Sequence, residues 1–209
     1  MRYWGLILLF LLAGCASAPS QRATTPGSTP APSASVDHTN SARIVLPLPR
    51  LTPQSFQGSA DLLQRLVISR TDGKTVPEQL IEVMLQIDPA EVRLAGFALG
   101  QRVMLLDWDG HDLQVWRHPK LPEQVDAERV LRDVQFVYWP AGAVSSVLRP
   151  GWTLDDAGNV RLLSHDGRPV LRVTFRSTPR RTSHAELENY AEGYRIAIDS
   201  AEQSPGGRP

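Results

Sequence analysis

Apolar and polar residues alternate with a period of two in several segments of the chain. In residues 81–87 every odd-numbered position is apolar, whereas the even-numbered positions include Glu82 and Gln86. The same alternation recurs in residues 92–94, 171–176 and 194–199. Such alternation predicts strands with one buried face, and strands of this kind are typical of antiparallel sheets.

Asp-Gly pairs separate strand-like segments at residues 72–73, 109–110 and 166–167. Asp-Gly favours the positive φ values of tight hairpin turns, so these pairs predict a β-meander with at least three hairpins. Residues 107–112 (DWDGHD) also resemble part of a calcium loop. They lack the third early ligand and the distal glutamate of that motif, which favours the hairpin interpretation.

One region has a helical period instead. Its apolar positions follow the i, i+3, i+4, i+7 spacing of an amphipathic helix: Ala127, Val130, Leu131, Val134, Val137 and Tyr138. Pro140 should end this helix, and a shorter apolar group at residues 143–148 follows it. Strands, one or two helices and further strands predict an α+β fold, with helices packed on one side of an antiparallel sheet.

The N-terminus has the features of a secretory signal. Arg2 precedes an apolar run at residues 5–12, and small residues lead to Cys15. The run is far shorter than the roughly 20 residues needed to span a bilayer. Residues 12–15 (LAGC) match the bacterial lipobox, which predicts that residues 1–14 are removed and Cys15 is lipidated. The alternative is a short anchor in which the cysteine is incidental.

Lipidation would fix the protein to a membrane. Each buried methylene contributes about 0.8 kcal/mol, so several acyl chains form an essentially permanent anchor. Ala16 follows the cysteine. In enterobacterial-type sorting an aspartate at this position tends to retain a lipoprotein at the inner membrane, and alanine does not. We therefore expect the protein to be anchored in the outer membrane and to face the periplasm.

Composition divides the rest of the chain. Residues 15–42 form a lipidated N-terminus and tether, rich in Ser, Thr, Pro, Gly and Ala, that cannot bury enough surface to fold. Residues 43–200 are expected to form one domain, and residues 201–209 a disordered tail. Prolines at 47 and 49 predict an extended lead-in to the domain.

Charge argues against a nucleic-acid partner, because the chain carries 22 basic and 22 acidic residues. The C-terminal third is nevertheless enriched in arginine, at Arg149, Arg161, Arg168, Arg172, Arg176, Arg180 and Arg181. We interpret these as solvated strand faces; contact with anionic lipid headgroups is the alternative.

No catalytic constellation is found in the sequence. The G-x-S-x-G, H-E-x-x-H, P-loop and G-x-G-x-x-G motifs are absent. The single cysteine is the expected acylation site, and His111, His118, His165 and His184 have no metal-ligand spacing. We therefore expect no enzymatic activity, no cofactor and no metal site.

Four segments, in this order behind the lipobox, carry a resemblance to a known family. They are residues 62–66 (LLQRL), 92–102 (VRLAGFALGQR), 130–135 (VLRDVQ) with Trp139-Pro140, and 189–195 (NYAEGYR). The chain resembles the LolB-like outer-membrane lipoproteins. More closely, it resembles a largely uncharacterised branch of them that is often associated with aryl-polyene or related fatty-acid-type biosynthesis clusters.

The resemblance implies an incomplete, strongly curved antiparallel β-barrel whose open side is covered by helices. It also implies that the space between them holds an acyl chain. The cargo would be a lipoprotein or an aryl-polyene-type lipid, received from a LolA-like periplasmic carrier and placed in the outer membrane. The candidate lining residues are Ile81, Val83, Leu85, Val130, Leu131, Val134, Val137 and Leu148, for which ordinary core packing is the alternative.

LolB-type proteins also carry a protruding loop with a leucine before a glycine that meets the membrane. Residues 98–100 (ALG) occupy the matching place, so the resemblance implies that Leu99 contacts the membrane. The usual proline before that leucine is replaced by Ala98. A hairpin leucine folded back onto the domain is the alternative.

Two other classes remain open beside a lipid carrier. A structural or assembly lipoprotein would bind another envelope protein through its sheet or helices. A periplasmic enzyme would need a reactive residue that the motifs do not show. Co-purifying lipid would distinguish the carrier from both.

Overall fold

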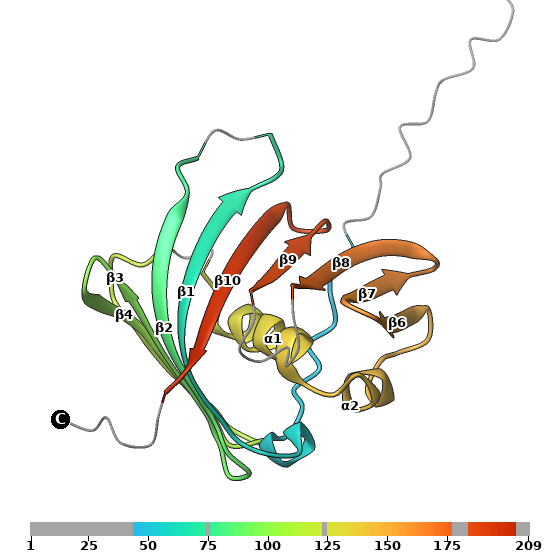
Figure 1. Ribbon diagram of the computed structural model, residues 1–209, viewed down its shortest axis with the longest axis horizontal. Helices are drawn as coiled ribbons and strands as arrows, with labels where there is room; N and C mark the ends of the chain where they lie inside the picture. The colour runs from blue at the N-terminus through green and yellow to red at the C-terminus, as the bar shows by residue number, and fades with distance from the viewer. Residues whose placement is uncertain (1–43, 74–75, 123–124, 177–183, 204–209) are drawn as a thin grey trace, which may run out of the picture. The chain divides into compact units, whose positions relative to one another are not determined.

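A computed structural model describes residues 44–73, 76–122, 125–176 and 184–203 (Figure 1). A short 3-10 helix at Pro53–Phe56 precedes the first strand. Five strands follow it: β1 (Ala60–Arg70), β2 (Gln79–Ile87), β3 (Val92–Ala98), β4 (Gln101–Trp108) and β5 (Leu113–Arg117). Two helices come next, α1 (Ala127–Tyr138) and α2 (Ala141–Ser146). Five more strands complete the domain: β6 (Trp152–Ala157), β7 (Val160–His165), β8 (Arg168–Phe175), β9 (Ala185–Asn189) and β10 (Tyr194–Glu202).

The strands form one antiparallel sheet in the order β5-β4-β3-β2-β1-β10-β9-β8-β7-β6. The first and last strands are therefore neighbours at its centre, where Leu66 pairs with Ile198. Strands β5 and β6 are its two open edges. This arrangement confirms the predicted α+β class and the antiparallel, incomplete barrel.

The three Asp-Gly pairs lie in the connections from β1 to β2, from β4 to β5 and from β7 to β8. Asp166 and Gly167 form the predicted tight two-residue turn, with φ values of 48° and 74°. The connection from β1 to β2 is longer than predicted, at residues 71–78, of which 74–75 lie outside the described residues. In the second turn Asp109 Oδ1 accepts hydrogen bonds from the amides of His111 (2.7 Å) and Asp112 (2.8 Å). These bonds lower the pKa of Asp109. The carboxylate thus stabilises a turn, which confirms the hairpin interpretation of residues 107–112.

Helix α1 has a defined start and end. Asp126 precedes it in an extended conformation and accepts hydrogen bonds from the amides of Glu128 (2.8 Å) and Arg129 (3.2 Å), which makes it the N-cap. Trp139, which precedes Pro140, has an extended backbone that ends the helix. Helix α2 stops at Ser146, earlier than the apolar pattern suggested.

Figure 1 shows α1 lying within the curve of the sheet, as predicted for a covering helix. Its inward side chains join those of both halves of the sheet in one core. The largest fully buried side chains of this core are Trp108, Trp139, Phe56, Phe136 and Phe175. Burial of such aromatic side chains contributes strongly to the hydrophobic stabilisation.

Arg161 on β7 holds the C-terminal end of α1. Its Nη1 donates to the carbonyl oxygens of Phe136 (2.7 Å) and Trp139 (2.8 Å), and its Nη2 pairs with Asp156 at 2.8 Å. A cation at this end complements the helix dipole and the carbonyls that lack helical partners. Arg161 is 3% exposed, so the prediction that it lies on a solvated face was wrong.

The lead-in before β1 also contacts α1. Residues 44–52 have no helix or strand, as predicted, and Leu46 and Leu51 are buried. Gln135 pairs with the backbone of Leu51 through both amide atoms, at 2.9 and 3.1 Å. Trp108 Nε1 donates to the Leu51 carbonyl oxygen at 2.8 Å. These bonds fix the start of the domain to the helix and to β4.

Several predictions concern residues outside the described part of the chain. These are the signal at residues 1–14, lipidation of Cys15, the tether up to residue 42, and the tail from residue 204 onward. Strand β10 continues to Glu202, two residues beyond the expected end of the domain. Among the described residues, no helix combines the length and the apolar character that crossing a membrane requires.

Candidate functional site: a cavity between the sheet and α1

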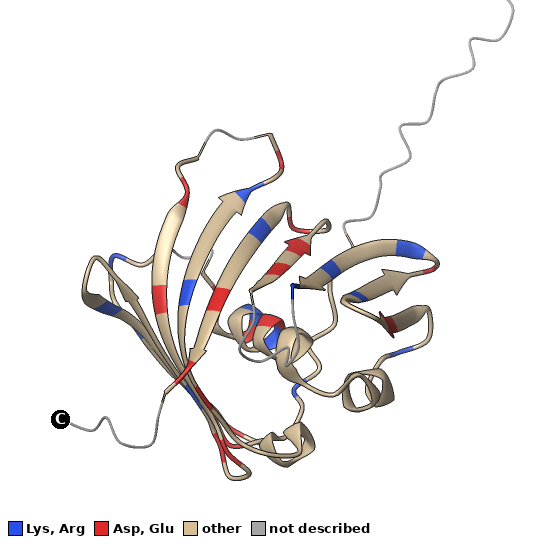
Figure 2. Cartoon of the chain, viewed as in Figure 1, with Lys and Arg blue, Asp and Glu red and all other residues tan. Residues whose placement is uncertain are grey.

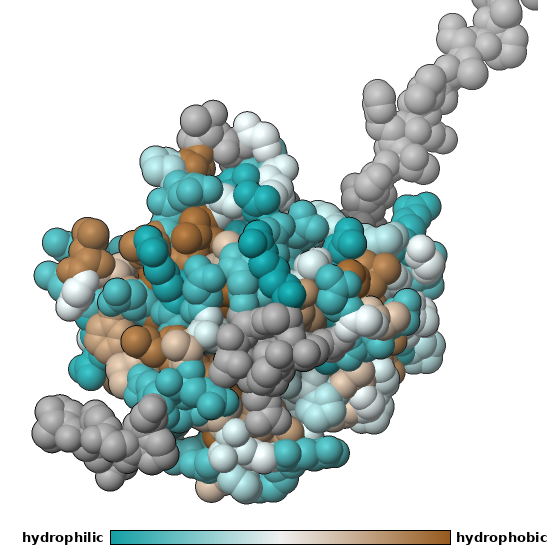
Figure 3. Space-filling view, viewed as in Figure 1, coloured by the Kyte–Doolittle hydropathy of each residue, from teal (hydrophilic) through white to brown (hydrophobic). Residues whose placement is uncertain are grey.

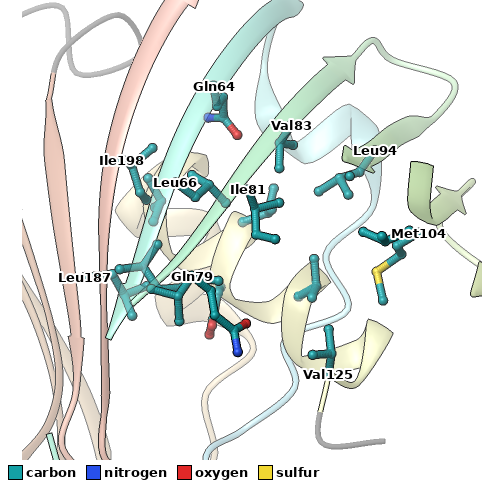
Figure 4. A pocket seen from close by; sticks show the side chains of 18 of the residues that line it. Gln64, Leu66, Gln79, Ile81, Val83, Leu94, Met104, Val125, Leu187 and Ile198 are labelled. Atoms are coloured by element: carbon teal, nitrogen blue, oxygen red, sulfur yellow. The ribbon is translucent and has the colours of Figure 1, made fainter. Parts of the chain in front are cut away.

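A cavity of about 150 Å³ lies between the inner face of the sheet and α1 (Figure 4). Its wall is mainly aliphatic. The strands contribute Leu66, Ile68, Ile81, Val83, Leu94, Met104, Leu187, Ile196 and Ile198, and α1 contributes Val130, Val134 and Val137. Leu121 and Val125, in the segment before α1, complete the apolar lining. A largely apolar cavity of this size can hold a small hydrophobic group.

Five of the eight candidate lining residues meet at this cavity: Ile81, Val83, Val130, Val134 and Val137. Leu85 and Leu131 are buried in the core instead. Leu85 lies one inward position beyond Val83 on β2, and Leu131 lines a smaller hollow beside Trp108 and Leu113. Leu148 packs against the core and is not part of the lining. For these three residues the core-packing alternative applies.

The sequence patterns did not identify the residues of β1, β3 and β4 that line the cavity. The inward side chains of Leu66, Leu94 and Met104 line the cavity, but only their period-two positions could have indicated this. Val103 and Met104, adjacent on β4, both reach the lining. The pairing register shifts at Gly96 and Phe97, opposite this point, and such a bulge redirects side chains in a way that simple alternation does not predict.

Exposure of the wall residues shows where the cavity opens. Along β2 exposure increases from buried Val83 through half-buried Ile81 to exposed Gln79, all of which line the cavity. Strand β1 changes in the same direction, from Gln64 to Ile68. The mouth therefore lies at the end of the sheet that carries the turn between β1 and β2.

The hairpin between β3 and β4 lies at this same end, because consecutive strands of a meander turn at alternate ends. Leu99 and Gly100 form its tip, with φ values of 51° and 72°. The Leu99 side chain is fully exposed, so it is not folded back onto the domain. A left-handed backbone is uncommon for a residue other than glycine, and the exposed Leu99 side chain is available for contact with another surface.

A buried polar cluster lies beside the mouth, between α1 and the turn from β9 to β10. Arg132 donates to both carboxylate oxygens of Glu192, at 2.9 and 3.0 Å, and to the Tyr194 hydroxyl at 2.8 Å. The Tyr194 hydroxyl donates to Asp133, whose side chain also faces the cavity. Burial raises the pKa of Asp133 and of Tyr194. Burial also raises that of Glu192, but its bonds to Arg132 outweigh this and lower the pKa overall. The bidentate pair joins the helix to the sheet.

Charges on the outer face of the sheet are of mixed sign (Figure 2). Arg65 on β1 lies between Asp199 on β10 and Glu82 on β2, and this alternation does not form a basic surface. Of the arginines enriched in the C-terminal third, four are exposed as predicted: Arg149, Arg168, Arg172 and Arg176. Arg180 and Arg181 lie outside the described residues.

Within the described ranges, no group of three or more His, Cys, Asp or Glu side chains is arranged to hold a metal ion. The histidines are dispersed. His165 packs its ring on Trp152, and His184 Nδ1 lies 2.7 Å from Asp199 Oδ1. The cavity wall and the exposed hairpin are thus the features of the described chain with the clearest functional content.

The outer face of the sheet carries a row of apolar side chains across neighbouring strands. Leu63, Met84, Ala95, Leu105 and Trp116 are directly paired in register from β1 to β5. Leu63, Met84 and Trp116 are exposed, and Figure 3 shows apolar surface among hydrophilic side chains over this part of the sheet. This row therefore leaves three apolar side chains exposed on the outer face.

Fold and site together define a protein with a curved, open antiparallel sheet that encloses an apolar cavity under a helix. Residues 61–202 match the family described as "Protein of unknown function (DUF3261)", and the chain belongs to this family. No curated protein matches it. The match extends from β1 to β10, so it covers the whole sheet and α1.

Proposed function

We propose that this protein is an outer-membrane lipoprotein of the LolB-like type that binds an apolar chain in the cavity. It is anchored through Cys15, faces the periplasm, and accepts or inserts a lipidated cargo at the membrane. The cargo is a lipoprotein or an aryl-polyene-type lipid, delivered by a LolA-like carrier. The role is one of binding and transfer, without catalysis.

The observation that carries this proposal is the aliphatic cavity that opens at one end of the sheet. Sequestering a hydrocarbon chain from water needs a concave apolar surface and little directional chemistry. A packed domain without a ligand would gain stability by filling such a space, because cavities weaken packing. A retained hollow between sheet and helix is therefore consistent with a bound apolar group.

The position of Leu99 supports the membrane part of the proposal. Its fully exposed side chain lies at the end of the sheet where the cavity opens. Insertion of this leucine into a bilayer would bring the mouth close to the lipid surface, so that a chain could leave the cavity without crossing water. The same geometry would serve uptake and delivery.

Cavity binding is tested on the chain from residue 15 onward, with Cys15→Ser so that no lipid is attached. Native mass spectrometry after expression in bacteria should show the protein with a bound lipid. Val134→Trp fills the cavity and should yield the ligand-free mass, whereas Val147→Trp, at an exposed position after α2, should retain the lipid. A ligand-free mass for the unsubstituted protein, with no uptake of added 1-palmitoylglycerol, would overturn the proposal.

Membrane contact is tested by flotation of the same protein with phosphatidylethanolamine–phosphatidylglycerol vesicles. Leu99→Glu should abolish co-flotation because it places a charge where an apolar side chain enters the bilayer. Leu63→Glu, an equal change on the outer face of β1, should leave flotation unchanged. Equal flotation of Leu99→Glu and the parent protein would exclude the proposed contact.

The exposed row on the outer face favours one second candidate, an assembly lipoprotein that binds another envelope protein through its sheet. If the protein is an assembly lipoprotein, Met84→Arg would impair its function in cells, and Val134→Trp would leave that function unchanged. The lipid-carrier proposal expects the opposite result for each variant.

A further inference from the structure

Three polar side chains meet beside the cavity, at the point where β1, β10 and α1 come together. Gln64 is 4% exposed, and its Nε2 donates to the Tyr138 hydroxyl and to Ser200 Oγ at 3.1 Å. The two hydroxyl oxygens are 3.0 Å apart. Gln64 and Tyr138 both line the cavity, and Figure 4 shows the Gln64 amide projecting from β1 on the same side as Leu66. We refer to Gln64, Tyr138 and Ser200 as the inner polar cluster.

The inner polar cluster lies at the end of the cavity farthest from the mouth. Gln64 is the most deeply placed lining residue of β1, and its partner on β2 is buried Val83. One inward position further, Leu62 and Leu85 are fully buried and belong to the core. A ligand entering from the mouth therefore reaches the cluster with its leading end.

The hydrogen bonds within the cluster leave some of its donor and acceptor groups without a partner. Both N–H groups of the Gln64 amide are occupied, while its carbonyl oxygen has no partner among the described residues. The bond between the two hydroxyls uses one of their two hydrogens as a donor. If the amide is turned around, its oxygen accepts from the hydroxyls and its N–H groups are left over. Either arrangement offers hydrogen bonds to a ligand.

The charge of the lining restricts what that ligand can be. The lining contains the acidic side chain of Asp133, and none of its described residues is Lys, Arg or His. A carboxylate or phosphate at the inner end would lose its hydration without meeting a cation, which is strongly unfavourable. An uncharged group that both donates and accepts a hydrogen bond matches the cluster in either amide orientation.

We propose that the inner polar cluster binds the uncharged hydroxyl group of an amphiphile whose apolar part fills the rest of the cavity. This inference rests on the proposed function and specifies its ligand. A cavity of similar volume in another protein accommodates benzene, so the enclosed space fits a hydroxyl group with about six carbon atoms. A longer chain extends through the mouth, and any charged head group lies outside.

Isothermal titration calorimetry of the Cys15→Ser chain with p-cresol, toluene and 4-methylbenzoate tests the inference, because these probes share a ring and differ in one group. We expect p-cresol to bind more tightly than toluene, by up to about tenfold, because one hydrogen bond typically contributes about 0.5–1.5 kcal/mol. We expect 4-methylbenzoate to bind more weakly than both. Toluene is the more hydrophobic ring, so burial alone predicts the reverse order for the first two probes.

Gln64→Leu should remove the preference for p-cresol while toluene binds at least as well as before, which also shows that the cavity is intact. Gln114→Leu, at an exposed position on β5 that does not line the cavity, should change neither affinity by more than about twofold. Equal binding of p-cresol and toluene to the parent protein, or an unchanged preference in Gln64→Leu, would overturn the inference and leave the proposed function standing. Binding of none of the probes would overturn the cavity-binding proposal itself.

Discussion

Arg161 offers the sharpest test of how the covering helix is held. Replacement by methionine keeps much of the aliphatic volume and removes the guanidinium. Two carbonyls at the end of α1 then lose a charged donor, and Asp156 loses its ion-pair partner at 2.8 Å. Hydrogen bonds to charged groups contribute about 1.5–3 kcal/mol each, and breaking a buried ion pair costs about 3–5 kcal/mol.

These contributions overlap, so we expect Arg161→Met to lower the free energy of unfolding by about 3–5 kcal/mol. This is a large fraction of the 5–15 kcal/mol typical of a domain. Urea unfolding followed by tryptophan fluorescence measures the change. Arg168→Met, an exposed position on the adjacent strand β8, is the control and should stay within about 0.5 kcal/mol of the parent. If both variants unfold at the same urea concentration, Arg161 does not hold the helix as described.

Three further predictions concern the mouth end of the sheet. Gly193→Ala should destabilise the domain by more than about 2 kcal/mol, because φ is +68° and a Cβ would lie 2.8 Å from Asp72 Cβ. Gly100→Ala, where φ is +72° and the surrounding space is open, should lower the free energy of unfolding by only about 1 kcal/mol. Equal losses for the two variants in urea unfolding would contradict this prediction. Glu192 has a lowered pKa, so its stabilising contribution is present at neutral pH and lost as the pH falls below about 4.5. Glu192→Gln should therefore make the free energy of unfolding fall less steeply as the pH is lowered through the acid range. An unchanged slope would count against the ion pair with Arg132. Tyr194→Phe removes the acceptor for Arg132 and Asn189, and thermal unfolding should show a loss of about 1–3 kcal/mol, whereas Tyr190→Phe, at an exposed position, should be neutral.

Local patterns predicted those elements that have a strong local determinant. The alternation in β2 and the Asp-Gly pairs depend on neighbouring residues only, so they can be recognised without the fold. Helix α1 was equally clear from its apolar spacing and from Pro140. The role of Asp126 as N-cap was missed, because it continues the polar face of the helix in the sequence.

Long-range features were harder to predict. The central pairing of β1 with β10 joins segments far apart in the chain, and no local signal indicates it. Arg161 follows the same alternation as exposed arginines, but the end of α1 lies above it in the fold and buries it. Val83 and Leu85 are equivalent in the sequence, yet only Val83 reaches the cavity. The residues that pack over each position decide this, and side-chain periodicity does not contain that information.

The central position of β1 and β10 has a consequence for how the domain assembles. Each half of the sheet consists of consecutive hairpins that can form from nearby residues, whereas the seam between the halves closes a loop that includes almost the whole domain. Such a closure is entropically costly, so we expect it to follow formation of the hairpins. Leu66 and Ile198 stand on opposite sides of that seam, and both line the cavity. A chain shortened so that β10 is lost would therefore lack part of the cavity wall. A ligand that occupies the complete site would hold the two halves together.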